Sequence, residues 1–360
     1  MYFKADSYIT DESYLLTYNI FELGDIAFEG NKSKNYAHGR FVENTIGNGI
    51  VSHVFDVFKP IMKPYDLQFW KYAINNEQLM GGILLRSTKA STMMTNLVAN
   101  DFLQETFLVP AYPEQQKIGA FFQELDRLIT LHQLKYEKLH NIKKSMLEKM
   151  FPKNGSNVPE IRFKGFTEAW EQRELWELTI WDKKFNEVDA EKQPQIKKYP
   201  YVLADVFSKI EDASGDVRLL STGNYVGYTT EEKAGNNLCF GEVVAIPWGG
   251  VPNVKYYSGK FVTADNRIAT SNDKEILDNR YLALFLEHNL EYLKSIYRGA
   301  SIKHPSMNDV LSMKLSIPTI KEQREIANFF TNLDCLITLH QRELEKLQNI
   351  KKSMLEKMFV

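Results

Sequence analysis

The chain has 360 residues, of which 44% are hydrophobic and 12% aromatic, and this is enough for two cores because single domains usually contain ~100–200 residues. Its formal net charge is -2, so the bulk charge gives no sign of a nucleic-acid binder, whose domains are often strongly basic. Cys239 and Cys335 show no CxxC or Cys/His metal spacing, which argues against a disulfide framework and a zinc site. The sequence shows neither a leader nor a long apolar run, which argues against export and a membrane span. Together these features favour a cytoplasmic protein.

Residues 1–112 form the first predicted globular domain. They are rich in aromatic and β-branched residues separated by turn signals, a pattern typical of an α+β domain. Residues 66–76 have the spacing of an amphipathic helix, and the short, polar and basic stretch 84–91 predicts a loop.

Residues 113–151 predict one long helix. Their apolar residues recur at helical spacing, and Pro110 and Pro113 stand at its start, where proline is tolerated. At 1.5 Å per residue, about 38 residues span roughly 57 Å, which is longer than a compact domain needs. Such a helix requires a partner along its apolar stripe.

The composition changes after the first long helix. Residues 152–169 contain the proline, glycine, asparagine and serine typical of a linker, and residues 170–318 again have the character of an α+β domain. Within this second domain, residues 279–289 predict an amphipathic helix and residues 296–304 a loop. Residues 246–252, IPWGGVP, superficially suggest a nucleotide-binding loop, but their glycine spacing favours a tight hairpin turn.

Residues 319–360 predict a second long helix that duplicates the first. Residues 114–151 and 322–359 align without a gap at an offset of 208, with roughly 27 identities in about 38 positions. Each helix is therefore the obvious partner of the other. Because the second domain must leave the end of one helix and return to the start of the other, we expect an antiparallel coiled coil with a globular domain at each end, related by an approximate two-fold axis.

The predicted helix–helix and partner interface consists of apolar residues of the two stripes. They are Phe121, Leu125, Leu128, Leu139, Ile142, Met146, Phe329, Leu333, Leu336, Leu347, Ile350 and Met354. His132 and His340 occupy the same position in the two copies. A metal site or a proton switch is one interpretation, but a histidine hydrogen-bonded within the helix seam is favoured.

Three sequence blocks are specific enough to carry a family resemblance. LITLHQ occurs at 128–133 and 336–341, NIKKSMLEKMF at 141–151 and 349–359, and the linker reads VPEIRFKGFTEAWEQREL. A chain with these blocks resembles the DNA-specificity subunit of Type I restriction-modification systems, which serve bacterial defence. In that family the globular segments are target-recognition domains that each read one half of a split DNA sequence, and the helices set the distance between the halves.

The resemblance also implies the partners. They would be double-stranded DNA, two methyltransferase subunits and, in the full complex, ATP-driven restriction subunits. The first domain departs from the family pattern, because 71 residues separate Trp170 from Gly241 (241 − 170), whereas 23 precede the matching Gly24. We therefore expect a shortened N-terminal target-recognition domain, and self-association of two chains would rebuild a symmetric reader from two second domains.

Base reading would depend on loop side chains. Arginine or lysine pairs favourably with guanine, and asparagine or glutamine with adenine. The predicted DNA-binding residues are Arg86, Ser87, Thr88 and Lys89 in the first domain and Asn253, Lys255, Tyr256, Asn266, Arg267, Arg298, Ser301, Lys303 and His304 in the second. The near-neutral net charge fits this hypothesis if partner subunits supply most phosphate contacts.

The sequence contains no convincing catalytic constellation. It has no GxxxxGK[ST] loop, no HExxH pair, and neither the glycine-rich loop nor the Asn/Asp-Pro-Pro-aromatic tetrapeptide of an adenine methyltransferase. We therefore expect a non-catalytic subunit that binds no cofactor and no metal. Two alternatives stay open: a structural coiled-coil adaptor whose globular ends bind proteins, and a truncated, non-functional variant of the specificity subunit.

Overall fold

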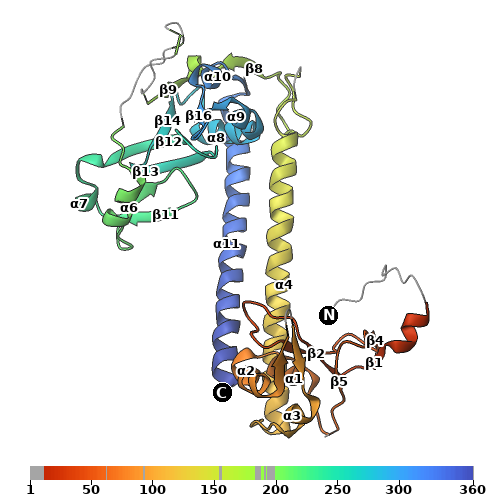
Figure 1. Cartoon of the computed structure of the whole chain (residues 1–360). Helices are drawn as coiled ribbons and strands as arrows, with labels where there is room; N and C mark the ends of the chain where they lie inside the picture. Colours follow the sequence, from red (N-terminus) through yellow and green to blue (C-terminus); the bar gives the residue numbers. More distant parts are fainter. Residues whose placement is uncertain are drawn as a thin grey trace. The chain divides into compact units, whose positions relative to one another are not determined.

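The computed structural model describes residues 12–61, 63–91, 94–153, 156–182, 188–189, 192 and 199–359. The chain forms two compact units, of which unit 1 comprises Met1–Glu137 and Thr338–Val360 and unit 2 comprises Lys138–Ile337. The division passes through both long helices and not through the predicted linker, because each globular part packs against its own end of the helix pair. Helices and strands mix in both units, which confirms the predicted α+β class (Figure 1).

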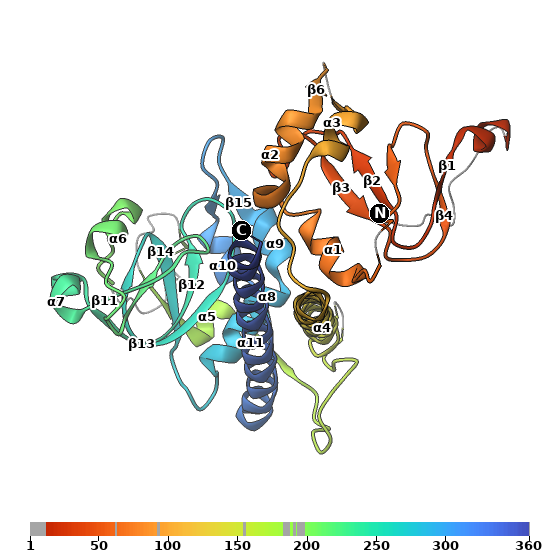
Figure 2. The ribbon, with the colours of Figure 1, turned by 90° about the horizontal axis from the view of Figure 1, so that it is seen from below.

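Unit 1 contains small antiparallel sheets packed on short helices. The three-stranded sheet has the order β3-β2-β5, while β1 pairs with β4 and β6 with β7. Helix α2 lies beside β3 and β2 (Figure 2). Phe28 and Phe41 of this sheet pack against Ile83 and Leu84 of α2. The elements are a 3-10 helix η1 Glu12–Thr17, β1 Asn19–Phe21, β2 Ile26–Glu29, β3 Arg40–Glu43, β4 Gly49–Val51, β5 Val57–Phe58, α1 Leu67–Ala73, α2 Glu77–Ser87, β6 Thr88–Ala90, β7 Thr95–Leu97 and α3 Ala99–Gln104.

Side-chain caps determine where the first helices begin. The Asp66 carboxylate accepts a hydrogen bond from the backbone N–H of Phe69, and the Asn76 side chain accepts one from Leu79, so each satisfies a donor that the first helical turn leaves free. The predicted helix at 66–76 thus corresponds to α1. The predicted loop at 84–91 is wrong, because this stretch ends α2 and forms β6.

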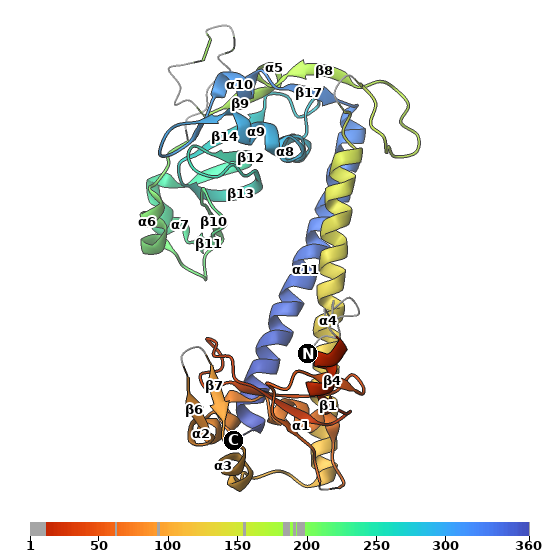
Figure 3. The same cartoon turned by 45° about the vertical axis from the view of Figure 1, so that its right-hand side comes forward.

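Unit 2 is built around a six-stranded sheet of order β11-β10-β13-β12-β14-β9 (Figure 3). All of its pairings are antiparallel except the parallel pair β10 and β13. The hairpin of β12 and β13 turns at residues 248–254, in agreement with the predicted hairpin turn. The elements are β8 Glu171–Glu174, α5 Leu175–Leu178, β9 Thr179–Trp181, α6 Ala204–Ile210, β10 Val217–Leu220, β11 Val226–Thr229, α7 Glu231–Ala234, η3 Gly235–Asn237, β12 Cys239–Pro247, β13 Lys255–Thr263, β14 Asn266–Ser271, α8 Asn279–His288, α9 Leu290–Ile296, β15 Tyr297–Arg298, β16 His304–Pro305, α10 Met307–Leu311 and β17 Lys314–Ile317.

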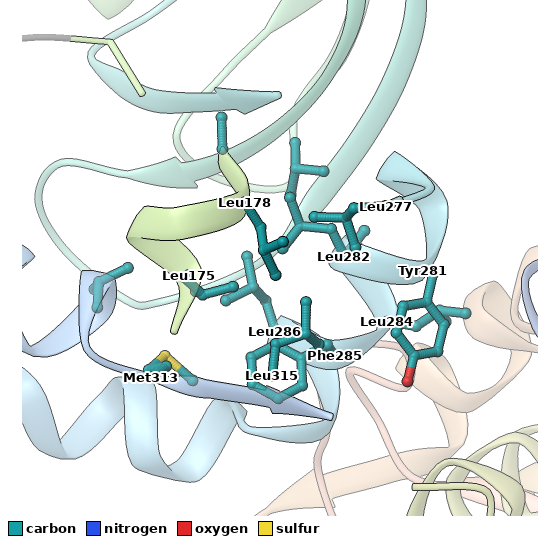
Figure 4. Close-up of a cluster of buried hydrophobic side chains, with 14 of the residues drawn as sticks. Leu175, Leu178, Leu277, Tyr281, Leu282, Leu284, Phe285, Leu286, Met313 and Leu315 are labelled. Atoms are coloured by element: carbon teal, nitrogen blue, oxygen red, sulfur yellow. The ribbon is translucent and has the colours of Figure 1, made fainter. Parts of the chain in front are cut away.

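The main core of unit 2 lies between α5, α8 and β17. Leu175 and Leu178 from α5, Leu282 and Leu286 from α8, and Leu315 from β17 are at most 1% exposed and point toward one another (Figure 4). Full burial of a leucine side chain contributes about 1.5–3 kcal/mol relative to exposure. This cluster therefore holds α5 and α8 against β17.

The two long helices are α4 Tyr112–Lys149 and α11 Ile320–Met358. In unit 1 the first part of α4 lies against the last part of α11, and Lys351 Nζ is 2.5 Å from Asp126 Oδ1. In unit 2 the last part of α4 lies against the first part of α11, and Lys143 Nζ is 2.9 Å from Asp334 Oδ1. Within each unit the helices are thus antiparallel, as predicted, and the two ion pairs join equivalent residues at the offset of 208. The approximate two-fold relation between the globular domains stays a prediction.

Most of the predicted stripe residues lie inside the two cores. Those buried in, or packed against, the unit 2 core are Leu139, Ile142, Met146, Phe329 and Leu333; those of unit 1 are Leu125, Leu347, Ile350 and Met354. Leu128 is half-buried. Phe121 and Leu336 are 39% and 44% exposed, so we remove these two residues from the predicted helix–helix contact.

Candidate nucleic-acid interface

Three loops of unit 2 meet beside the six-stranded sheet. They are residues 221–225 between β10 and β11, 248–254 between β12 and β13, and 299–303 between β15 and β16. The backbone N–H of Gly250 donates to the Lys303 carbonyl at 3.1 Å, and the Asn253 side chain donates to the Thr222 carbonyl at 2.8 Å. The middle loop is thereby bonded to both neighbours. We call these three segments the loop cluster.

Trp248 is the anchor of the loop cluster. Its ring lies 3.8 Å from the Arg267 guanidinium carbon and 5.0 Å from the His304 ring, and its carbonyl oxygen is 2.7 Å from His304 Nδ1. The next residue is Gly249, where a Cβ would lie 2.9 Å from a methyl group of Ile302. A side chain at position 249 would therefore push Ile302 away, so glycine favours this close approach of the two loops.

The loop cluster presents polar side chains to solvent. Asn224, Tyr225, Ser301 and Lys303 of the cluster are exposed, and so is Arg298 at the end of β15, directly before the third loop. Arg298 forms an ion pair with Asp309 at 2.8 Å but is still 73% exposed. Guanidinium, ammonium, amide and hydroxyl groups are the groups that contact phosphates and base edges in DNA.

A positive and aromatic surface continues from the loops onto the sheet. The Lys255 ammonium donates to the Ser221 carbonyl, and burial, together with the nearby Arg218, lowers its pKa to about 8. Arg218 lies over the Tyr228 ring at 5.2 Å. The charges of Lys255 and Arg218 repel each other, so binding of an anion beside them would be favoured.

The structure adds Arg218, Asn224 and Tyr225 to the candidate site, none of which the sequence predicted. Residues 221–225 carry an ordinary turn signal. Such a signal predicts a loop but not which other loops will lie beside it. The side chains of the predicted residues Lys255 and Asn253 donate hydrogen bonds to the Ser221 and Thr222 carbonyls of this turn.

Two predicted DNA-binding residues of β14 are buried, which corrects their assignment. Asn266 and Arg267 are 2% and 1% exposed. The Asn266 amide donates to the Leu220 carbonyl at 2.9 Å, and Arg267 is paired with Asp265 at 3.1 Å. Because β14 is an inner strand between β12 and β9, these side chains support Trp248 and the adjacent strands and do not reach DNA.

Tyr256 also lies apart from the loop cluster. Successive residues of a strand point to opposite faces, so Tyr256 faces away from Lys255. Its hydroxyl donates to Glu242 Oε1 at 2.9 Å. It is 38% exposed but belongs to a different surface from the other predicted residues.

The four residues predicted in unit 1 do not form a loop. Arg86 lies in the last turn of α2 and makes a two-point ion pair with Glu105, with Nε and Oε1 2.8 Å apart. Ser87 is fully buried, donates to the Ile83 carbonyl and is removed from the predicted DNA-binding set. Thr88 is half-buried and bonded to the Leu84 carbonyl, whereas Lys89 is exposed on β6.

The part of the chain that the structure describes holds no group of three or more His, Cys, Asp or Glu side chains positioned to bind a metal ion. None of its helices is both long and apolar enough to cross a membrane.

The sequence model of the family described as the Type I restriction modification DNA specificity domain matches residues 167–349, slightly more than half of the chain. The chain belongs to this family. The part that matches the DNA specificity domain contains the complete loop cluster of unit 2, and the globular part of unit 1 lies outside it.

Relatives with specificity-subunit names align with parts of the chain. The MjaVIII specificity subunit of Methanocaldococcus jannaschii is 26% identical over 117 residues, which are 32% of this chain and 28% of the relative. The MjaX specificity subunit of the same organism is 25% identical over 250 residues, 69% of this chain and 56% of the relative. The chain thus spans between about a quarter and about half of these relatives.

A solved structure shares the fold over most of the chain. The S subunit of a Type I restriction-modification system from M. genitalium superposes with a TM-score of 0.63 at 15% sequence identity, covering 95% of this chain and 84% of that one. A specificity-domain fold is therefore present in spite of low sequence identity.

Proposed function

We propose that the chain is a non-catalytic DNA-sequence-specificity subunit of a Type I restriction-modification complex, and that the loop cluster of unit 2 reads bases. The observation that carries this proposal is the meeting of three loops that expose Asn224, Tyr225 and Lys303, with Arg298 exposed on the adjacent strand β15. Sites built on a rigid scaffold hold their side chains in reproducible positions, as base reading requires.

The side chains divide by chemistry. Arg298 and Lys303 supply positive charge for phosphate oxygens or guanine edges, and Asn224 has the donor and acceptor that match adenine. A good two-point pair between a side chain and a base is worth about 1–3 kcal/mol of discrimination. Lys255 and Arg218 add charge behind the loops.

We further propose that the target has two halves and that unit 1 reads the second. The helices α4 and α11 contribute to both units, and this supports a role in setting the distance between the halves. Their repeated exposed faces would bind two methyltransferase subunits, and restriction subunits would join these in the full complex. Such a complex would act on double-stranded DNA in the cytoplasm.

The decisive experiment maps modified adenines in cells that contain the chain and its methyltransferase partners. Replacing residues 221–225 and 299–303 together with Gly/Ser loops of equal length should abolish or alter one half of the methylated motif and leave the other half unchanged. Lys274→Ala is the matched control, because this exposed lysine follows the far end of β14, away from the loop cluster. An unchanged motif in the loop variant, with altered recruitment of a protein, would favour the structural adaptor.

A further inference from the structure

In unit 2 the segment before β8 covers the start of α11. Arg162 makes a two-point ion pair with Glu322, at 2.6 and 2.8 Å, and Glu322 is fully buried. The Phe163 ring lies 6.0 Å from the Phe329 ring in an edge-to-face contact. Strand β8 then pairs with β17 along its whole length. Linker and strand together therefore act as a cover on the junction between β17 and α11.

Unit 1 contains the same junction without such a cover among the residues that the structure describes. Residues 106–109 are equivalent to β17 at the offset of 208, but they pair with no described strand. Leu108 is 93% and Val109 44% exposed, whereas their counterparts Ser316 and Ile317 are each 8% exposed.

The helix side of the unit 1 junction is open as well. Glu114, the equivalent of the buried Glu322, is exposed. Phe121, the equivalent of Phe329, is 39% exposed, and its described ring contact is with the adjacent Phe122. A carboxylate, an aromatic ring and an apolar backbone edge are thus aligned on one surface.

The backbone frame of this surface is already formed. The Gln115 side chain donates to the Pro110 carbonyl at 2.9 Å, and its equivalent, Gln323, donates to the Pro318 carbonyl at 3.0 Å. Both bonds fix the angle between the extended segment and the helix. The extended segment is therefore tied to the first turn of the long helix by the same side-chain bond in both units.

We infer that this unit 1 surface, residues 106–109 with Glu114 and Phe121, is a docking site for a segment of another polypeptide with the chemistry of residues 161–174. The segment would bear adjacent arginine and aromatic residues, followed about eight residues later by an extended strand. The arginine would pair with Glu114, the aromatic ring would pack on Phe121, and the strand would pair with residues 106–109. This inference goes beyond DNA reading and does not depend on it.

Physical chemistry favours occupation of the surface. A free backbone edge with exposed apolar side chains readily accepts an added strand, and main-chain hydrogen bonds then provide much of the affinity. The Glu114 carboxylate selects for a cation, and the planar guanidinium of arginine matches a carboxylate at two points. The covered copy in unit 2 shows all three contacts made at once.

A labelled synthetic peptide with the sequence of residues 159–178 tests the inference by fluorescence anisotropy on the intact chain. Unit 2 holds its own covalently attached copy at high effective concentration, so free peptide should bind unit 1. We expect saturable binding, with protection of the amides of residues 106–109 from hydrogen exchange. Glu114→Arg should weaken binding about ten-fold or more, and an Arg162→Glu peptide should restore binding to that variant.

The control is Glu137→Arg, which reverses an exposed charge further along α4 and should leave binding unchanged. Absence of binding to the intact chain would overturn the inference. Binding that arises only after residues 1–11 are deleted would show that this chain's own first residues are the occupant. Self-association that depends on Glu114, without peptide binding, would assign the surface to a second copy of the chain.

Discussion

His132 and His340 face each other across the helix pair of unit 1, with their Nδ1 atoms 3.2 Å apart. They are 208 residues apart and occupy the same position in the two copies of the helix. Equivalent residues of two antiparallel copies meet only where a local two-fold axis crosses the pair. The contact therefore supports the seam-histidine interpretation, and it marks the midpoint of the repeat.

Acidification should weaken this contact. Burial, followed by the nearby His132 and Lys135, lowers the pKa of His340. A lowered histidine pKa means that its contribution to stability is complete above the unfolded value of about 6.5 and is lost as the pH falls through the folded value. The thermal unfolding midpoint should therefore be lower at pH 5 than at pH 7.5. His340→Asn keeps a polar group without titrating, so an equally steep drop in this variant would contradict the explanation.

The two equivalent ion pairs of the helices should differ in strength. The Lys143 side chain is 16% exposed and contacts both Glu287 and Asp334, whereas Lys351 is 27% exposed and pairs with Asp126. Lys143→Ala should cost about 1.5–3 kcal/mol of unfolding free energy and Lys351→Ala about 1 kcal/mol. Chemical denaturation of the two variants measures the difference. Lys346→Ala, at a 66% exposed position, is the control, and equal losses in all three variants would refute the order.

Glu43 should make unit 1 less stable at alkaline pH. Burial, followed by the charge of Asp66, raises its pKa to about 9, although Lys71 acts in the opposite direction. Above a pH of about 4.5 the unfolded chain releases this proton while the folded chain keeps it, so stability falls by about 1.4 kcal/mol per pH unit up to about pH 9. Glu43→Gln should flatten this dependence and raise the stability at pH 8. A variant with an unchanged pH profile would show that Glu43 is ionised in the folded protein.

Single substitutions in the loop cluster should separate affinity from specificity. Lys303→Ala should weaken binding to all DNA sequences similarly and reduce the slope of log affinity against log salt by about 1. Asn224→Ala should change discrimination at one base pair by about 1–3 kcal/mol. Titration of the complete methylating complex with a set of single-base variants of its target measures both effects. If Lys303→Ala but not Asn224→Ala lost discrimination between bases, Lys303 would be the base-reading residue and Asn224 would not.

The long helices and the fold class could be predicted from the sequence because their signals are local or repeated. The spacing of Ile118, Phe122 and Leu125 indicates a helix without any tertiary information, and the duplication identifies its partner. All three residues are buried in unit 1. The antiparallel direction followed from connectivity alone.

The residues that form the candidate site were much harder to predict from the sequence. Arg267 and Asn266 are polar and lie beside predicted loops, but burial between two strands makes them structural. Conversely, Asn224 belongs to a turn whose neighbour, the loop at 248–254, is distant in the sequence. Which polar residues face solvent depends on strand order, and strand order in a mixed sheet has no local signal.

The position of Phe359 in the core of unit 1 affects the order in which the two units fold during synthesis. Phe359 is 4% exposed and packs on Phe69 and Phe122 in the core of unit 1, whereas unit 2 is a single continuous stretch, Lys138–Ile337. Because translation proceeds from the N-terminus, the ribosome releases all of unit 2 before it releases the residues that close unit 1. The globular part of unit 1 is therefore translated before unit 2 but completed after it, and until then its apolar surface is available to chaperones.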